Sequence, residues 1–131
     1  APVWVQPEFS WSAVVGIAVS DRFEIVFDTL TDTRKARNLL LNPQVAFTIA
    51  SLEADASWSI QYEGVVDQPK GEDLERLVEL YLSVFPDGRA RQTWPGLMYL
   101  RATPVWLRYS DFGREPPEIL EFGVPELAAL I

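Results

Sequence analysis

The sequence predicts one mainly β domain, a barrel or sandwich of short antiparallel strands that carries two helices. Two observations support this prediction: short apolar runs separated by turn residues recur along the chain, and only two segments show helical spacing. The 131 residues match the usual size of a single domain and are enough to bury a real core. We therefore predict one unit over residues 1–131, and an alternating βαβ sheet is disfavoured.

Apolar and β-branched runs predict the strands. The first two, Ala13–Val19 and Phe23–Phe27, are separated by Ser20-Asp21-Arg22, which predicts a tight hairpin. The further predicted strands are Val45–Ala50, Trp58–Val66, Leu97–Arg101, Val105–Tyr109 and a short final segment, Ile119–Phe122. Thr103-Pro104 is expected to separate two of these strands, because proline interrupts a ladder of backbone hydrogen bonds.

Two segments predict helices. The first runs from Thr33 to about Leu41, with Thr31 or Asp32 as a candidate cap and Asn42-Pro43 as its end. The second, Leu74–Phe85, has apolar residues at helical spacing behind an acidic first turn. We expect the apolar stripe of this second helix to pack on the sheet.

The residue types that are missing restrict the chemistry. The chain contains no cysteine and no histidine. This excludes disulfides, thiolate sites, a Ser-His-Asp triad and haem binding through histidine. Nothing in the pattern of acidic residues suggests a metal site. An enzyme of this composition would depend on a bound cofactor for its chemistry.

The net charge of −8 argues against binding to nucleic acids or to anionic membranes. No apolar stretch approaches the roughly 20 residues that cross a bilayer. A cytoplasmic location is the expectation. The chain opens at Ala1 without methionine, and residues 1–11 lack the features of a signal peptide, which leaves open whether residues precede them.

The densest polar pattern is Thr29–Asn38, where a strand end, a capped helix start and three basic residues follow one another. A helix start offers unpaired backbone N–H groups and the positive end of the helix dipole. Arg34 and Lys35 add donors that suit phosphate oxygens. The alternative is that these residues are solvated surface charges paired with nearby acids.

Three segments in this order resemble a known family: Val26–Thr29, Thr33–Leu39 and Asn42–Ala46. Together they are similar to the pyridoxamine 5′-phosphate oxidase-like flavin-binding split barrels. The similarity continues through Ile60–Val66 and the late strands, and covers about residues 13–122. It implies an antiparallel Greek-key split β-barrel, and a homodimer with two FMN sites that are each built from both subunits.

The resemblance assigns roles only to residues that match the family pattern. Thr29 would contact the ring or ribityl part of the flavin, and Thr33, Arg34 and Lys35 would hold the phosphate. Ser59 and Gln61 would reach the flavin from the partner subunit; the alternative is that they are ordinary polar positions on a solvated sheet face.

The tryptophans add aromatic candidates. Trp94 and Trp106 could stack on a flavin ring or line its substrate pocket, although packing in the core or in a dimer interface is a competing role for each. The five tryptophans and the 12% of aromatic residues also favour association into a dimer, because they exceed what a small core readily hides.

Two departures from the family pattern argue against a true pyridoxamine phosphate oxidase. Ala13 stands where those enzymes have a phosphate-binding arginine, and the C-terminal substrate segment with its arginine and histidine has no counterpart. Residues 1–11 also do not resemble the usual opening helix and first strand of the family, which leaves the pairing of the first strand open.

The function expected from the resemblance is that of an FMN-dependent oxidoreductase acting on a small molecule of unknown identity. A related enzyme would use a deazaflavin in place of FMN. A flavin-binding or sensing protein without turnover would fit the same sequence pattern, as would a dimeric barrel whose site has degenerated.

Overall fold

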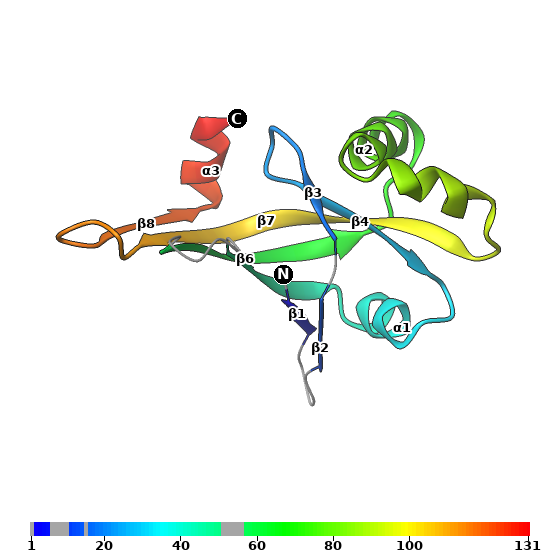
Figure 1. The fold of residues 1–131 in the computed structure, drawn as a ribbon, viewed down its shortest axis with the longest axis horizontal. Helices are drawn as coiled ribbons and strands as arrows, with labels where there is room; N and C mark the ends of the chain where they lie inside the picture. Colours follow the sequence, from blue (N-terminus) through cyan, green and yellow to red (C-terminus); the bar gives the residue numbers. More distant parts are fainter. Residues whose placement is uncertain (1, 6–10, 15, 51–56) are drawn as a thin grey trace.

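The structure is a computed structural model that describes residues 2–5, 11–14, 16–50 and 57–131, with side chains from residue 16 onward (Figure 1). Its strands are β1 Pro2–Val5, β2 Trp11–Val14, β3 Ala18–Val19, β4 Ile25–Leu30, β5 Gln44–Ala50, β6 Trp58–Asp67, β7 Leu97–Asp111 and β8 Glu118–Gly123. Its helices are α1 Arg34–Leu41, α2 Gly71–Val84, α3 Val124–Leu130 and the 3₁₀ helix η1 Pro86–Thr93.

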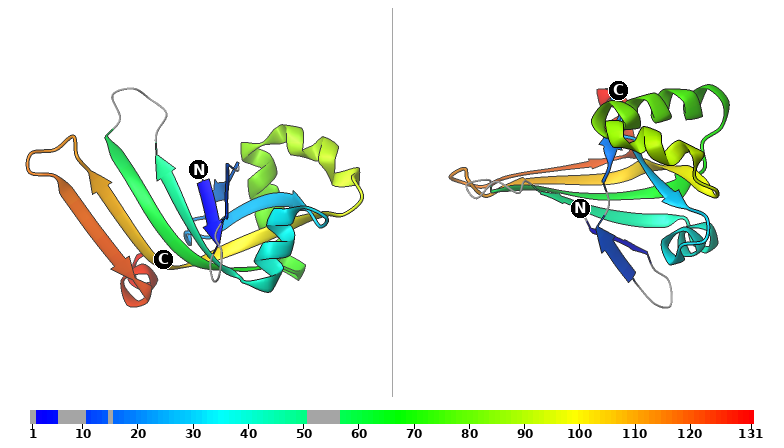
Figure 2. Two further views of the ribbon diagram at one scale, coloured as in Figure 1. Left: turned by 90° about the horizontal axis from the view of Figure 1, so that it is seen from below. Right: turned by 45° about the vertical axis from the view of Figure 1, so that its right-hand side comes forward.

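All described strands join one antiparallel sheet in the order β2-β1-β5-β6-β7-β4-β3, with β8 paired to β7. The 15-residue β7 organises this sheet. It pairs with β6 along one edge, while its other edge pairs first with β4 and then with β8. Because the strands are strongly curved, the sheet coils around itself (Figure 2). The predicted mainly β antiparallel class is confirmed.

The two strands predicted on either side of Thr103-Pro104 are one continuous strand. Pro104 pairs with Gly64 and Trp106 pairs with Glu63, so that Val105 is an extra residue on β7. This irregularity is a β-bulge, one of the few places in a sheet that accept proline. Proline therefore bends the strand here without ending it.

The first two predicted strands also have other boundaries in the structure than the sequence predicts. Ala13–Val19 contributes to β2 and β3, with residue 15 outside the described residues, and Phe23–Phe27 contributes to β4, which begins at Ile25. β1 pairs with both β2 and β5. The first strand, whose pairing the sequence left open, therefore lies between β2 and β5.

Both predicted helices are present. The cap of α1 is Thr33, not Thr31 or Asp32, because its hydroxyl accepts a hydrogen bond from the N–H of Ala36 at 3.2 Å. The structure adds η1 and α3 to the two predicted helices. α3 has only seven residues, and helices this short depend on tertiary contacts; the contact here is the buried side chain of Leu127.

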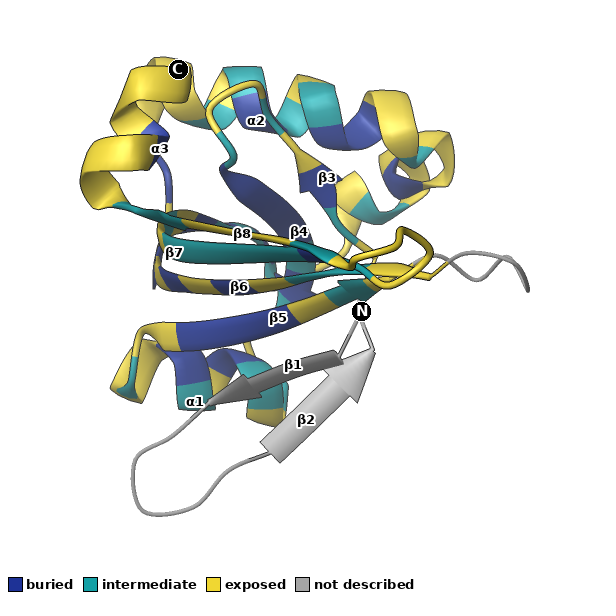
Figure 3. Ribbon diagram, turned by 90° about the vertical axis from the view of Figure 1, so that its left-hand side faces the viewer, coloured by how far each residue is buried: buried dark blue, intermediate teal, exposed yellow. Residues whose placement is uncertain are grey.

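The core lies on both sides of β4. One cluster packs the sheet against α1, and the other packs α2 against β3 and β4, as the buried segments in Figure 3 show. Leu77 of α2 is fully buried, with Tyr81 and Leu82 beside it. The predicted docking of this helix through its apolar stripe is confirmed.

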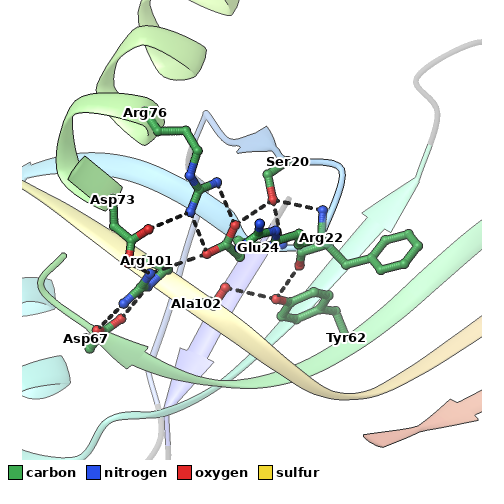
Figure 4. A network of polar contacts seen from close by, with 10 residues as sticks. Ser20, Arg22, Glu24, Tyr62, Asp67, Asp73, Arg76, Arg101 and Ala102 are labelled. Carbon is green, nitrogen blue, oxygen red and sulfur yellow. Dashed lines mark hydrogen bonds and ion pairs between the residues drawn. The ribbon is translucent and has the colours of Figure 1, made fainter. Parts of the chain in front are cut away.

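An ion-pair network ties the turn between β3 and β4 to α2 and to β7 (Figure 4). The buried carboxylate of Glu24 accepts from Arg76 at 2.9 Å and from Arg101 at 3.3 Å. Arg101 also donates to Asp67 and Asp73. Burial alone raises the pKa of Glu24, but hydrogen bonds from Arg76 and Ser20 and the two positive charges outweigh it and lower that pKa.

Candidate anion-binding site

The end of β4 and the start of α1 bring four of the predicted site residues together. Thr29 is buried in β4, where it pairs with Met98 of β7. Its hydroxyl lies 3.1 Å from the hydroxyl of Thr33, and Arg34 and Lys35 form the first turn of α1. This cluster is the candidate anion-binding site.

The hydroxyl of Thr33 is fully used by the protein. It donates to the carbonyl oxygen of Leu30 at 2.8 Å and accepts from the N–H of Ala36. Since a hydroxyl has one proton and two lone pairs, the contact with Thr29 must have Thr29 as its donor. The Thr33 hydroxyl therefore caps the start of α1, and its donor and both acceptor positions are occupied by the protein.

Lys35 is a half-buried cation. Its Nζ lies 5.6 Å from the ring centroid of Phe27, a core residue. Burial lowers the pKa of Lys35, and the charge of Asp28 partly offsets this effect. An anion bound next to the ammonium group would restore the stabilisation that Lys35 loses by burial.

Arg34 and Lys35 stand apart from most of the arginines of this chain. Arg76, Arg91, Arg101, Arg108 and Arg114 each have a carboxylate within ion-pair distance. In the described part of the chain, no carboxylate lies that close to Arg34 or Lys35. Their charges are therefore available to a ligand.

Trp94 lies close to this site through the backbone of its loop. Two residues after Trp94, the carbonyl of Gly96 accepts a hydrogen bond from the N–H of Thr31 at 2.8 Å. Gly96 has a φ of +78°, and a Cβ there would lie 2.8 Å from Oγ1 of Thr31. The loop thus packs closely on the end of β4, with the Trp94 side chain 50% exposed.

Ser59 and Gln61 lie elsewhere, on the face of β6 opposite the side chain of buried Tyr62. No hydrogen bond or ion pair of the described residues joins them to the start of α1. A role at the same ligand would require a second copy of the chain to bring them there, as the resemblance implies.

Sequence reasoning missed Arg108. Strand register places it directly opposite Gln61, with Thr48 on the far side of Gln61 and Glu121 beyond Arg108. Its Nε is buried without a hydrogen-bond partner among the described residues, and lies 3.8 Å from Oε1 of Glu121. The sequence does contain a signal, because side chains alternate between the two faces of β7. Arg108 could be placed beside Gln61 only once the pairing of β7 with β6 was known.

A pocket of about 170 Å³ lies beside Gln61, and Trp106 forms part of its wall. This places the second aromatic candidate on the same sheet face as Gln61 and Arg108. Ala13, where the family has an arginine, lies in β2 opposite Val3, and its side chain is outside the described residues.

Two further findings concern the described residues only. They hold no group of three or more acidic side chains placed to bind a metal ion. None of their helices combines the length and the apolar character that a bilayer crossing needs.

Comparison with known proteins identifies the fold of this chain. No protein-family model and no curated protein sequence matches this chain. Among solved structures, a haem-binding protein from Mycobacterium smegmatis superposes with a TM-score of 0.83 at 18% identity. The superposition covers 98% of this chain and 54% of that protein, so the chain spans about half of its length.

Two further solved structures share the fold. A pyridoxamine 5′-phosphate oxidase-related, FMN-binding protein from Nostoc punctiforme has a TM-score of 0.65 at 12% identity, over 94% of this chain and 85% of that one. The haem storage protein HutZ from Vibrio cholerae has a TM-score of 0.68 at 15% identity, over 79% of each chain. The chain therefore has the pyridoxamine 5′-phosphate oxidase-like split-barrel fold, as the sequence predicted.

Proposed function

We propose that the chain is an FMN-dependent oxidoreductase that holds the phosphate of FMN at the start of α1. The observation that carries this proposal is the pair Arg34 and Lys35, two cations without a carboxylate partner in the described part of the chain, on the first turn of a helix. An FMN-binding protein shares the fold and so supports the choice of ligand.

The donors at the helix start fit a phosphate. The N–H of Ala36 is bound by the Thr33 hydroxyl, and the N–H of Arg37 by the Thr33 carbonyl at 3.1 Å. Among the described hydrogen bonds, none uses the N–H of Arg34 or of Lys35, as expected for the first turn of a helix. Two backbone N–H groups and two cationic side chains are thus available to hold a phosphate at this helix start.

The second half of the site is proposed to come from a second copy of the chain. Ser59 and Gln61 would contact the flavin from the partner subunit, and Arg108 would add a positive charge beside Gln61. The homodimer is part of this proposal. Bound flavin supplies hydride or electron transfer, and the protein supplies binding, orientation and electrostatics.

The same binding experiments also test two other cofactors. A deazaflavin with a phosphate-bearing tail would use the same cations. Haem-binding proteins share the fold, but the 131 residues contain no histidine, so haem would need a different axial ligand.

The test compares FMN with riboflavin, which has the same ring system but no phosphate. Arg34→Ala and Lys35→Ala are each expected to lower the affinity for FMN about tenfold to a hundredfold, the equivalent of one charge-assisted hydrogen bond. The affinity for riboflavin is expected to stay nearly unchanged. Arg37→Ala is the matched control, because Arg37 is exposed on the same helix and donates to the backbone oxygen of Asp32. Quenching of flavin fluorescence gives the affinities.

Two results would contradict the proposal. One is an unchanged preference for FMN in both variants, which would place the phosphate elsewhere. The other is tight binding of hemin, followed by the Soret band, without binding of FMN. Turnover of NADH or NADPH in air by the FMN-loaded protein would support the enzyme over a flavin carrier.

A further inference from the structure

A second cavity lies on the opposite side of the sheet from Gln61. It has a volume of about 310 Å³ and lies between α3, the turn between β3 and β4, and strands β5 to β8. The floor of the cavity consists of two rows of side chains that strand pairing places next to one another. One row across the sheet is Phe47, Tyr62, Leu107 and Phe122, and the next is Ile49, Ile60 and Tyr109. Most of these floor residues line the cavity directly.

The described lining residues are apolar, and none of them carries a charged side chain. The residues are Val19, Phe23, Ile25, Ile49, Ile60, Tyr62, Leu107, Tyr109, Phe122, Leu127 and Leu130. The two tyrosine hydroxyls are the only polar side-chain groups among them. That of Tyr62 lies within hydrogen-bond distance of two backbone carbonyls, Phe23 at 2.8 Å and Ala102 at 3.1 Å. The walls therefore favour an uncharged occupant.

The wall formed by Phe23 is strained. Phe23 has a φ of +61°, in a hairpin position where glycine is the usual residue. The Tyr62 hydroxyl holds its carbonyl, and the Phe23 ring lines the cavity. A bulky residue persists in such a conformation only where its surroundings enforce it, and strain of this kind is concentrated at ligand sites.

This cavity is separate from the candidate anion-binding site. The cavity is lined by residues of α3 and by Ile25 at the start of β4, whereas the anion site begins at Thr29 and continues into α1. Figure 1 shows α1 and α3 well apart from each other. No residue is shared between the two. A ligand in one would leave the charges of the other untouched.

We propose that the cavity is a second binding site, for one uncharged and mainly hydrocarbon molecule of two or three aromatic rings. Apolar cavities of about 150 Å³ accept benzene, and this cavity is about twice that volume. Volumes of about 300 Å³ and more are typical of small-molecule sites. Four aromatic side chains, those of Phe23, Tyr62, Tyr109 and Phe122, line it and suit a flat ring system.

The probe is N-phenyl-1-naphthylamine, an uncharged amine that joins a naphthalene and a phenyl ring and whose fluorescence rises in apolar surroundings. Its matched partner is 8-anilinonaphthalene-1-sulfonate, which has the same rings and one negative charge. We expect one naphthylamine to bind per chain and the sulfonate to bind at least about tenfold more weakly, because the cavity offers no cation.

Two surface variants on α3 test the location. Leu130 is exposed at the rim and lines the cavity, while the neighbouring Ala129 is exposed and does not line it. Leu130→Asp is expected to lower the affinity for the naphthylamine about tenfold or more. Ala129→Asp is expected to change this affinity by less than about twofold. Both variants add the same charge to the same helix, so a general effect on α3 would appear in both.

Equal affinities in the two variants, or equal affinities for the two probes, would overturn the proposal, since either would indicate a general apolar surface. Arg34→Ala and Lys35→Ala are expected to bind the naphthylamine like the parent chain. This arm separates the second site from the FMN proposal, so that either can fail without the other.

Discussion

Nη1 of Arg76 donates to Oε1 of Glu24 over 2.9 Å, and this ion pair joins α2 to the turn between β3 and β4. The two residues are 52 positions apart in the sequence. The same turn carries Phe23, whose ring lines the apolar cavity and whose carbonyl accepts from Tyr62. The ion pair therefore positions one wall of the proposed second site.

Glu24→Gln is expected to lower the free energy of unfolding at neutral pH by about 1.5 to 3 kcal/mol, the range for hydrogen bonds to a charged group. The pKa of Glu24 is lowered in the folded chain from its ordinary 4.5. Its stabilising contribution is therefore complete above that pH, and is lost as the pH falls through the folded-state pKa.

Urea unfolding of both proteins at pH 7 and at several values below 4.5 measures this difference, which should shrink with acid. Glu79→Gln is the control, because Glu79 is exposed on α2, the helix that carries Arg76, and makes no ion pair with a described residue. A difference that stays constant with pH would show that packing, not charge, stabilises the turn.

Leu77→Ala is expected to cost about 2 to 5 kcal/mol, because this side chain is fully buried between α2 and the sheet. Val84→Ala, on an exposed position of the same helix, is expected to stay within about 0.5 kcal/mol. Equal effects of the two substitutions on the urea midpoint would contradict the packing of α2.

Affinity for FMN is expected to fall as the pH rises through the pKa of Lys35, which burial holds below its ordinary 10.5. The bound phosphate favours the charged ammonium, so loss of that proton removes the attraction. Riboflavin should show no matching loss over the same interval. In Lys35→Ala, the ratio of the FMN affinity to the riboflavin affinity should not depend on pH over this interval. If that ratio still falls as the pH rises, Lys35 is not the source of the loss.

Gly96→Ala is expected to destabilise the chain by about 1 kcal/mol or more, because a positive φ disfavours any residue with a Cβ. The added carbon would lie 2.8 Å from Oγ1 of Thr31, so either the Thr31 side chain or the loop next to the end of β4 must shift. We therefore also expect weaker FMN binding, with Gly71→Ala as a control: its φ is +61°, but its Cβ would meet nothing within 4 Å. Similar losses of FMN affinity in the two variants would show that the loop does not position the site.

Sedimentation is expected to show a homodimer at micromolar concentration. The proposed site is incomplete without Ser59 and Gln61 of a second copy. A monomer in the presence of FMN, with FMN bound at full affinity, would contradict this prediction.

The sequence by itself determined the parts of this protein that depend on neighbours along the chain. The apolar spacing of Leu74–Phe85 predicted α2, and Thr29–Lys35 predicted a strand end followed by a helix start with a basic first turn. These features follow from local periodicity and local charge, which the order of residues contains directly. The split-barrel fold was implied by the resemblance of several such segments, in their order, to a known family.

Only the tertiary structure decided which strands meet. It shows that β7 continues through Pro104 at a bulge and places Arg108 opposite Gln61. It also gathers side chains from β3 to β8 and α3 around one apolar cavity. Pairing and register depend on contacts between residues far apart in the chain, and the hydrophobic pattern specifies which face of a strand is buried but not which strand lies beside it.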